Sequence, residues 1–205
     1  MARIPPRIEL EVMLDNLKPH PDPNPWLEQY TTPAEVAAEM LFTAAFIHDD
    51  VKFKLVADLG CGTGRLGIGA LVLGAHKLVG VDIDPNAIAV AVDNSLEAEV
   101  FEKSCWIVGN VSTLQGSFDT ILMNPPFGTR RKHLDVAFLY EALGLAKVVY
   151  SIHKSSTRQF VMDFISRMGY RVSTLLKIDL EIPHTFDFHE RIKHPVEVDV
   201  YRIVR

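Results

Sequence analysis

The stretch DLGCGTG, residues 58–64, decides the fold, because it joins an apolar run to a helical pattern. Leu55–Leu59 is short and apolar, as in a buried strand, and Gly64–Leu73 has the length and spacing of a helix. The glycines between them allow a tight turn and let a ligand approach the backbone closely. Together these features predict the first strand–helix unit of a parallel sheet that binds a ligand at this turn.

The same alternation continues along the chain. We expect further strands at 77–81, 105–108, 118–123 and 148–152, and helices at 86–95, 134–146 and 155–168. Two longer strands near 170–181 and 195–204 close the chain without a helical pattern between them, so they should form an antiparallel pair at one edge. The pattern predicts an α/β fold with a mostly parallel sheet and helices on both faces.

The first 50 residues differ from this pattern. Residues 8–17 are helix-like, and prolines at alternate positions from Pro19 to Pro25 predict an extended segment. Thr32-Pro33-Ala34-Glu35 is typical of a capping box with proline at the first helical position. We therefore expect Thr32 to cap a helix that runs toward Phe46. The chain divides into an N-terminal helical segment, 1–50, and an α/β domain, 51–205, within one structural unit.

Composition narrows the class of protein. The chain has 205 residues, of which 48% are hydrophobic and 23% charged, which is ordinary for a soluble globular protein. Cys61 and Cys105 are isolated, which favours neither a zinc site nor a disulfide framework and fits a reducing cytoplasm. No signal peptide is visible, and the most apolar stretch, 66–75, is too short to span a membrane. Although the net charge is −5, residues 128–205 carry 13 basic and 9 acidic side chains, which favours one anion-facing surface.

The ends of the second and third strands complete a ligand-binding edge. Asp82 lies 22 residues after Gly60, where a carboxylate can accept hydrogen bonds from both hydroxyls of a ribose. Asp84-Pro85 is instead typical of a helix cap. The Asn110 side-chain carbonyl and the Val111 backbone can meet an adenine ring. The spacing G-x-G-x-G differs from the G-x-G-x-x-G of dinucleotide enzymes, although both classes use the ribose carboxylate. The predicted cofactor-binding residues of this edge are Asp58, Gly60, Gly62, Thr63, Asp82, Asn110 and Val111.

The tetrapeptide NPPF, residues 124–127, indicates the chemistry. Its two prolines cannot continue a strand, so they form a stiff corner at the carboxyl end of the sheet. An exocyclic amine on a base is a poor nucleophile, because its lone pair is delocalised into the ring. Two acceptors, the Asn124 side-chain oxygen and the Pro125 carbonyl, can hold its N–H bonds and turn the lone pair toward a methyl donor. Phe127 can stack on the base. We predict Asn124, Pro125, Pro126 and Phe127 as the catalytic residues.

Several stretches carry a resemblance to a known family. The order GCGTG, VDID and NPPF resembles the class I methyltransferases that modify amines. LEQYTT (27–32), ADLGCGTGRLGIGA (57–70), MNPPFGT (123–129), YSIHKSSTR (150–158) and VEVDVYR (196–202) are similar to the small-subunit ribosomal RNA N6-adenine methyltransferases, the methyltransferase-like-protein-five group and its archaeal relatives. The likeness covers nearly the whole chain. It implies a Rossmann-like, seven-stranded sheet with an antiparallel last strand, and S-adenosylmethionine as the cofactor.

The resemblance also assigns roles to particular residues. It implies cofactor contacts at Gln29 and Thr32, over the methionine end, so that residues 1–50 would cover the cofactor. The family usually has an acid where this chain has Asn110, so the bond to adenine would lack charge assistance. Basic side chains follow NPPF and the fifth strand, and others lie near the end of the chain, where they could hold RNA phosphates. The predicted RNA-binding residues are Arg130, Arg131, Lys132, His153, Lys154, Arg158, Arg191 and Lys193.

A partner is also implied. The third strand, 105–108, would lie at an open edge of the family's sheet, where it could accept a further strand. The resembling eukaryotic enzymes work with a small zinc-binding activator protein. A homo-oligomer through this edge is a second possibility, and the third is that Trp106 packs under a helix and the edge is covered by the chain's own loops.

Alternative functions remain open from the sequence. The same motif logic serves methylation of a glutamine side chain of a translation factor, or of a base amine in DNA or tRNA. A non-catalytic ribosome assembly factor could retain the fold, and a dehydrogenase could share the ribose carboxylate. The basic segments favour RNA over the glutamine substrate, and the glycine loop together with NPPF favours an enzyme.

Overall fold

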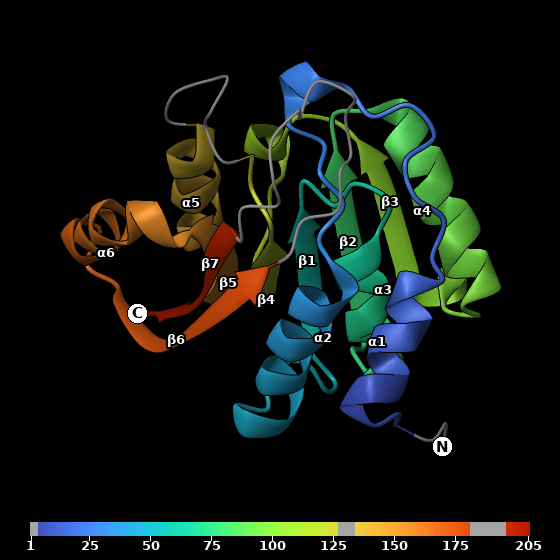
Figure 1. Cartoon of the computed structure of the whole chain (residues 1–205), viewed down its shortest axis with the longest axis horizontal. Helices are drawn as coiled ribbons and strands as arrows, with labels where there is room; N and C mark the ends of the chain where they lie inside the picture. Colours follow the sequence, from blue (N-terminus) through green and yellow to red (C-terminus); the bar gives the residue numbers. More distant parts are fainter. Residues whose placement is uncertain (1–3, 127–133, 181–195) are drawn as a thin grey trace.

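The computed structural model describes residues 4–126, 134–180 and 196–205 and contains one seven-stranded sheet (Figure 1). The strand order is β3-β2-β1-β4-β5-β7-β6. Strands β1 to β5 are parallel, and β7 runs antiparallel to both of its neighbours, β5 and β6. The fold class predicted from sequence is confirmed, including the antiparallel pair. The strands are β1 (Leu55–Leu59), β2 (Lys77–Asp82), β3 (Ser104–Val108), β4 (Phe118–Met123), β5 (Ala146–Lys154), β6 (Arg171–Leu180) and β7 (Val196–Val204).

The helices also follow the predicted pattern, with ends shifted by a few residues. They are α1 (Arg7–Asp15), α2 (Ala34–Phe42), α3 (Arg65–Val72), α4 (Pro85–Glu97), α5 (Leu134–Leu145) and α6 (Arg158–Arg167). The expected cap of α2 is wrong. Pro33 occupies the N-cap position without a side-chain hydrogen bond, and the Thr32 hydroxyl instead accepts a bond from Asn124. After Phe42 the helix widens into a π-helical turn, Thr43–Ile47.

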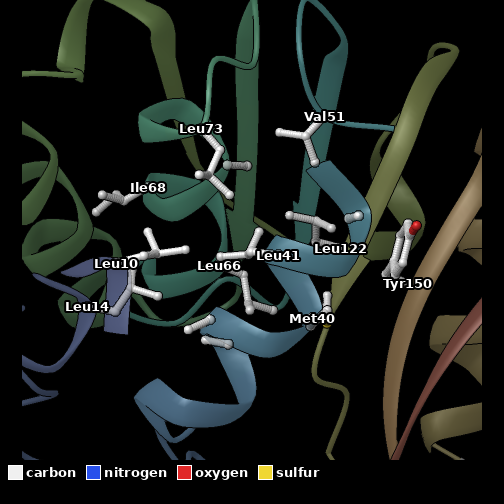
Figure 2. Close-up of a cluster of buried hydrophobic side chains, with 14 of the residues drawn as sticks. Leu10, Leu14, Met40, Leu41, Val51, Leu66, Ile68, Leu73, Leu122 and Tyr150 are labelled. Carbon is white, nitrogen blue, oxygen red and sulfur yellow. The ribbon is translucent and has the colours of Figure 1, made fainter. Parts of the chain in front are cut away.

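Two apolar clusters hold the helices against the two faces of the sheet. Figure 2 shows the first cluster, which contains Leu10 of α1, Leu41 of α2 and Ile68 of α3 together with Leu122 and Tyr150 of the sheet. The second cluster lies on the opposite face, where α5 and α6 pack on β1, β4 and β7. Because α1 and α2 share the first cluster with the sheet, the N-terminal segment is anchored by the same core as the rest.

The edge strand β3 is covered on one face and open along its outer side. Trp106 packs over Gly80 of β2, and its indole nitrogen donates to the Ser95 hydroxyl of α4 at 3.1 Å. Trp106 therefore packs under a helix, as one alternative from the sequence proposed. Cys105 and Val108 remain exposed. Among the described residues, no helix has the length and apolarity needed to cross a membrane.

The contact between Gly80 and Trp106 predicts a steric effect on stability. A β-carbon at position 80 would lie 2.3 Å from two ring carbons of Trp106, far inside van der Waals contact. We expect Gly80→Ala to lower the free energy of unfolding by about 2–3 kcal/mol in denaturant titrations, through overpacking. Gly144→Ala is the matched control, because a β-carbon there meets nothing within 4 Å and alanine favours the helix α5. Equal stability of the two variants would contradict this packing account.

Candidate active site

A cavity opens where the parallel strands β1 to β4 end. Its volume is about 370 Å³, within the range of small-molecule sites. Side chains and backbone from the ends of all four strands line it, together with the first turns of α3, the segment before α2 and one face of α5. This is the place where open α/β sheets bind their ligands. Most residues that the sequence singled out lie here, as the following contacts describe.

The glycine loop folds over the end of β2. The backbone N–H groups of Gly60 and Cys61 both donate to the Val81 carbonyl, at 2.8 and 3.0 Å. Gly62 has φ +52° and Gly64 has φ +87°, left-handed conformations in which glycine is not strained. A β-carbon at Gly62 would meet nothing within 4 Å, so the loop backbone stays open to a ligand in the cavity.

Asp58 is the most buried carboxylate of the cavity. One of its oxygens, Oδ2, accepts from the Gly67 N–H at 2.8 Å and so satisfies the first turn of α3. The other oxygen, Oδ1, is buried and has no hydrogen-bond partner among the described residues. Burial raises the pKa of Asp58 to about 7. The position therefore combines a structural role with an acceptor that a ligand can use.

Asp82 and Asp84 make different contacts, and the predicted helix cap at Asp84 is confirmed. Asp84 caps α4 by accepting from the Asn86 N–H at 2.8 Å. The Asp82 carboxylate lines the cavity, accepts from the Gly62 N–H at 2.8 Å and from the Asp84 N–H at 3.0 Å. Burial raises the pKa of Asp82. Both Asp82 oxygens retain an acceptor position, so the proposed ribose contact stays a prediction that this geometry permits.

Asn110 and Val111 line the cavity beyond the end of β3. The Asn110 side-chain oxygen accepts from the backbone N–H and the hydroxyl of Ser112, both at 3.0 Å, and caps the short helix Val111–Thr113. The sequence did not indicate this capping role. An adenine amino group would have to share the same oxygen, and the adenine contacts of Asn110 and Val111 stay predictions.

A segment before α2 crosses the cavity, and we call residues 18–32 the strap. Asn94 of α4 holds its start by bonding both backbone groups of Lys18, and also donates to the Thr63 carbonyl. Asp84 holds its middle, accepting from the Gln29 amide at 2.7 Å and contacting the His20 ring at 3.1 Å. Gln29 thus lies beside Asp84, at the Asp82 side of the cavity.

The Asn124-Pro125-Pro126 corner lies at the other end of the strap. The Asn124 side-chain nitrogen donates to the Thr32 hydroxyl at 2.9 Å, across 92 positions in sequence. The Asn124 oxygen is buried and has no hydrogen-bond partner among the described residues. Pro126 also lines the cavity. The nitrogen end of the amide is therefore fixed by Thr32, and the role of its oxygen as a substrate acceptor stays a prediction.

Among the polar residues that the sequence analysis missed, Arg65 and Asn94 hold the strap in place. Arg65 begins α3, lines the cavity and donates to the Thr32 carbonyl at 2.7 Å. A cation in the first turn of a helix is disfavoured by the helix dipole, and this signal could have drawn attention to it. Asn94 offered no signal, because an asparagine within a helical pattern is more often solvated, whereas here the side chain is fully buried.

Two predicted RNA-binding residues have other roles in the structure. His153 is wrong as an RNA contact, because it is buried, bonded to the Ser151 hydroxyl at 2.7 Å and packed edge-on against Tyr201. Burial lowers the pKa of His153 to about 4, so the ring stays neutral. Arg158 uses its Nε and one terminal nitrogen to pair with the buried Asp199 carboxylate, at 2.6 and 2.7 Å. Its guanidinium is thus committed to holding α6 on β7.

The remaining predicted residues are not tested by these contacts. Lys154 is half-buried at the end of β5, and RNA binding there stays a prediction. Phe127, Arg130, Arg131, Lys132, Arg191 and Lys193 lie outside the described residues.

Comparison with known proteins agrees with this site. The family model described as the methyltransferase small domain matches residues 35–145. The rRNA N(6)-adenosine-methyltransferase Mettl5 of Drosophila melanogaster is 39% identical over 98% of this chain and 97% of its own. The protein MJ0284 of Methanocaldococcus jannaschii, whose function is uncharacterised, is 36% identical over 95% of this chain and 92% of its own.

A solved structure extends the likeness to the whole fold. The crystal structure of PH1948 from Pyrococcus horikoshii, described as a candidate RNA methyltransferase, is 40% identical, with a TM-score of 0.89 over 100% of this chain and 98% of that one. The chain belongs to the methyltransferase small-domain family, and within it to the group of the Mettl5 rRNA N6-adenosine methyltransferases and their archaeal relatives.

Proposed function

We propose that this S-adenosylmethionine-dependent methyltransferase methylates N6 of an adenine in small-subunit ribosomal RNA. The observation that carries the proposal is the Asn124 amide, whose nitrogen is held by Thr32 while its buried oxygen has no partner among the described residues. A buried acceptor without a donor is costly, so the position fits a substrate that brings an N–H group. The Mettl5 relatives, named as rRNA N6-adenosine methyltransferases, support adenine as that substrate.

The chain's residues act on the amine by orientation. The Asn124 oxygen and the Pro125 carbonyl each accept one N–H bond of the exocyclic amine, which turns the nitrogen lone pair into the cavity. Both acceptors follow the end of β4, where the two prolines stiffen the backbone. Phe127 stacks on the base. No strong general base is needed, because the amine proton can leave to water after its nitrogen has gained the methyl group.

The residues of the cavity fit S-adenosylmethionine, which supplies a methyl group activated by its sulfonium. Asp82 would accept the ribose hydroxyls, and Asn110 with the Val111 backbone would meet the adenine. The buried Asp58 oxygen without a partner among the described residues would accept the α-ammonium group. The glycine loop would approach the amino-acid part through its open backbone. Gln29 and Thr32 would close the strap over the cofactor, Gln29 from the side of Asp84. The cofactor-binding set is therefore Gln29, Thr32, Asp58, Gly60, Gly62, Thr63, Asp82, Asn110 and Val111.

The RNA would lie over the same edge of the sheet. Lys154 ends β5, the neighbour of β4, which places it at the same edge of the sheet as the amine clamp. The basic residues Arg130, Arg131, Lys132, Arg191 and Lys193 complete the proposed phosphate contacts. We place the reaction in the cytoplasm, since both cysteines are free thiols.

We further propose that the outer side of β3 receives a protein partner. The strand is the edge of the sheet, and Ile107 and Val108 are 36% and 53% exposed beside it. An open edge with exposed apolar side chains is a template for strand addition. The small zinc-binding activator implied by the family resemblance is the partner we favour, and a second copy of the chain is the alternative.

Substitution of Asn124 tests the proposed chemistry. Asn124→Ala removes the acceptor, so turnover on small-subunit RNA should fall at least about 100-fold, the usual cost of one preorganised polar contact. S-adenosylhomocysteine affinity, measured by titration calorimetry, should stay within a few-fold. Asn124→Asp keeps an acceptor and should retain more activity than alanine. Near-normal turnover of the alanine variant would refute the amine clamp.

The pKa of Asp58 predicts a pH dependence of cofactor affinity. Above a pKa of about 7 the carboxylate is ionised and can pair with the α-ammonium group, whereas below it the group is neutral. The affinity for S-adenosylhomocysteine should therefore rise several-fold, at most about tenfold, between pH 6 and 7.5. Asp58→Asn should flatten this dependence. 5′-Methylthioadenosine lacks the amino-acid part and serves as the control ligand. The same slope for both ligands would show that Asp58 is not the group responsible.

Hydrogen exchange tests the β3 edge. In a dilute monomer, the amides of 104–108 that point away from β2 should exchange rapidly, because no strand of the described residues pairs with that side of β3. They should become protected on addition of the zinc-binding partner, or at high protein concentration if the chain pairs with itself. Slow exchange of all these amides in the dilute monomer would remove the need for any partner.

A further inference from the structure

Arg65 makes no ion pair within the described part of the chain, and Asp15 acts on its charge only through attraction at longer range. Its Nη1 donates to the Thr32 carbonyl at 2.7 Å, while its Nε is buried and without a hydrogen-bond partner among the described residues. The ion pairs of the described residues do not include it. Arg65 is also the one arginine or lysine among the described residues that line the cavity.

This placement is costly without an anion. Burial lowers the pKa of Arg65, which reflects the loss of solvation of its guanidinium. The residue also stands first in α3, where the partial positive charge of the helix end repels a cation. An opposite charge nearby offsets the free-energy cost of removing such a group from water. A ligand that presents an anionic group toward Nε would supply that counter-charge.

The rest of the cavity limits what this ligand can be. Glu28, Asp58, Asp82 and Glu141 line the same space. This acidic lining disfavours a polyanion such as a nucleotide phosphate, and favours a cationic molecule with a single anionic group. The amino-acid part of S-adenosylmethionine, with its α-ammonium and α-carboxylate, has this character, so the inference rests on the proposed cofactor.

We propose that Arg65 binds the α-carboxylate of the cofactor and that Thr32 transmits this contact to Asn124. Thr32 is bonded on both sides: its carbonyl accepts from Arg65, and its hydroxyl accepts from the Asn124 side-chain nitrogen. The second bond fixes which end of the Asn124 amide faces the substrate. Thr32 is thus a positioning residue for the amine clamp, and Arg65 is a cofactor-binding residue.

The arrangement couples the two halves of the site. A cofactor carboxylate holds the Arg65 guanidinium, the guanidinium holds the Thr32 backbone, and the Thr32 hydroxyl holds the amide of Asn124. The last two of these bonds are already formed in the structure, so a bound cofactor would stabilise the orientation that the Asn124 acceptor has there. Thr32 affects turnover through Asn124, and this effect is separate from any contact that Thr32 makes with the cofactor.

Ligand binding tests the role of Arg65. Titration calorimetry of the full chain should show that Arg65→Met weakens S-adenosylhomocysteine binding about 10- to 100-fold, the range for a charged hydrogen bond. The affinity for 5′-methylthioadenosine, which has no carboxylate, should change less than about twofold. Arg65→Lys should recover part of the difference. Arg171→Met, an exposed arginine on β6, is the control for loss of a cation. An equal loss for both ligands would overturn the carboxylate assignment.

Kinetics test the role of Thr32. Thr32→Val should lower kcat at least about tenfold, as expected when a catalytic group is misplaced, and this factor should exceed any loss of S-adenosylhomocysteine affinity. Thr32→Ser restores the hydroxyl and should restore kcat. Thr174→Val is the matched control, because Thr174 lies on β6 and its hydroxyl is bonded to His48. Unchanged kcat in Thr32→Val, or failure of serine to rescue it, would overturn the positioning role.

The same titrations separate this inference from the proposed function. If the wild-type chain bound neither S-adenosylhomocysteine nor 5′-methylthioadenosine, the proposed cofactor itself would be wrong, and the inference would fall with it. If the wild type bound both and Arg65→Met left their ratio unchanged, the inference alone would fail. Tight wild-type binding with a selective loss in Arg65→Met supports both.

Discussion

The parallel register of β1, β2 and β4 is the constraint on which the site depends. Leu59 pairs with Val81 on one side and with Met123 on the other, so the three strands end at the same level. The glycine loop and Asn124 directly follow the ends of β1 and β4, and Asp82 is the last residue of β2. Strand pairing therefore brings to one cavity the predicted cofactor turn, ribose acceptor and amine acceptor, which are separated by up to 64 positions in sequence between Gly60 and Asn124.

The strap depends on a different kind of contact. The described residues from 18 to 32 are held to the domain by polar bonds at Asn94, Asp84, Arg65 and Asn124. Each bond is worth little in net stability, but each fixes a direction. The core anchors α1 and α2 at either end of the strap, so the intervening bonds need only orient it. Side chains of the strap can therefore contribute to the site although they are not part of the apolar core.

Local signals were sufficient for much of the fold. The apolar runs predicted β1 and β4 with their correct first and last residues, and Asp84-Pro85 predicted the cap of α4. These features were predictable because strand length and capping depend on residues that are neighbours in sequence. Thr32 shows where such signals fail. Its sequence is typical of a helix cap, but Asn124, 92 positions away, takes its hydroxyl. His153 was misjudged for the same reason, since its burial is decided by Tyr201 on a strand that pairs only in the folded state.

The central claim is that the cavity and the Asn124 corner serve one reaction on one chemical group. The most direct measurement is transfer of labelled methyl from S-adenosylmethionine to small-subunit RNA, large-subunit RNA, tRNA, DNA and protein, followed by identification of the methylated product. The account predicts label in N6-methyladenosine of small-subunit RNA. Label in N5-methylglutamine, in another nucleoside or in another polymer, or no transfer to any of them, would contradict it.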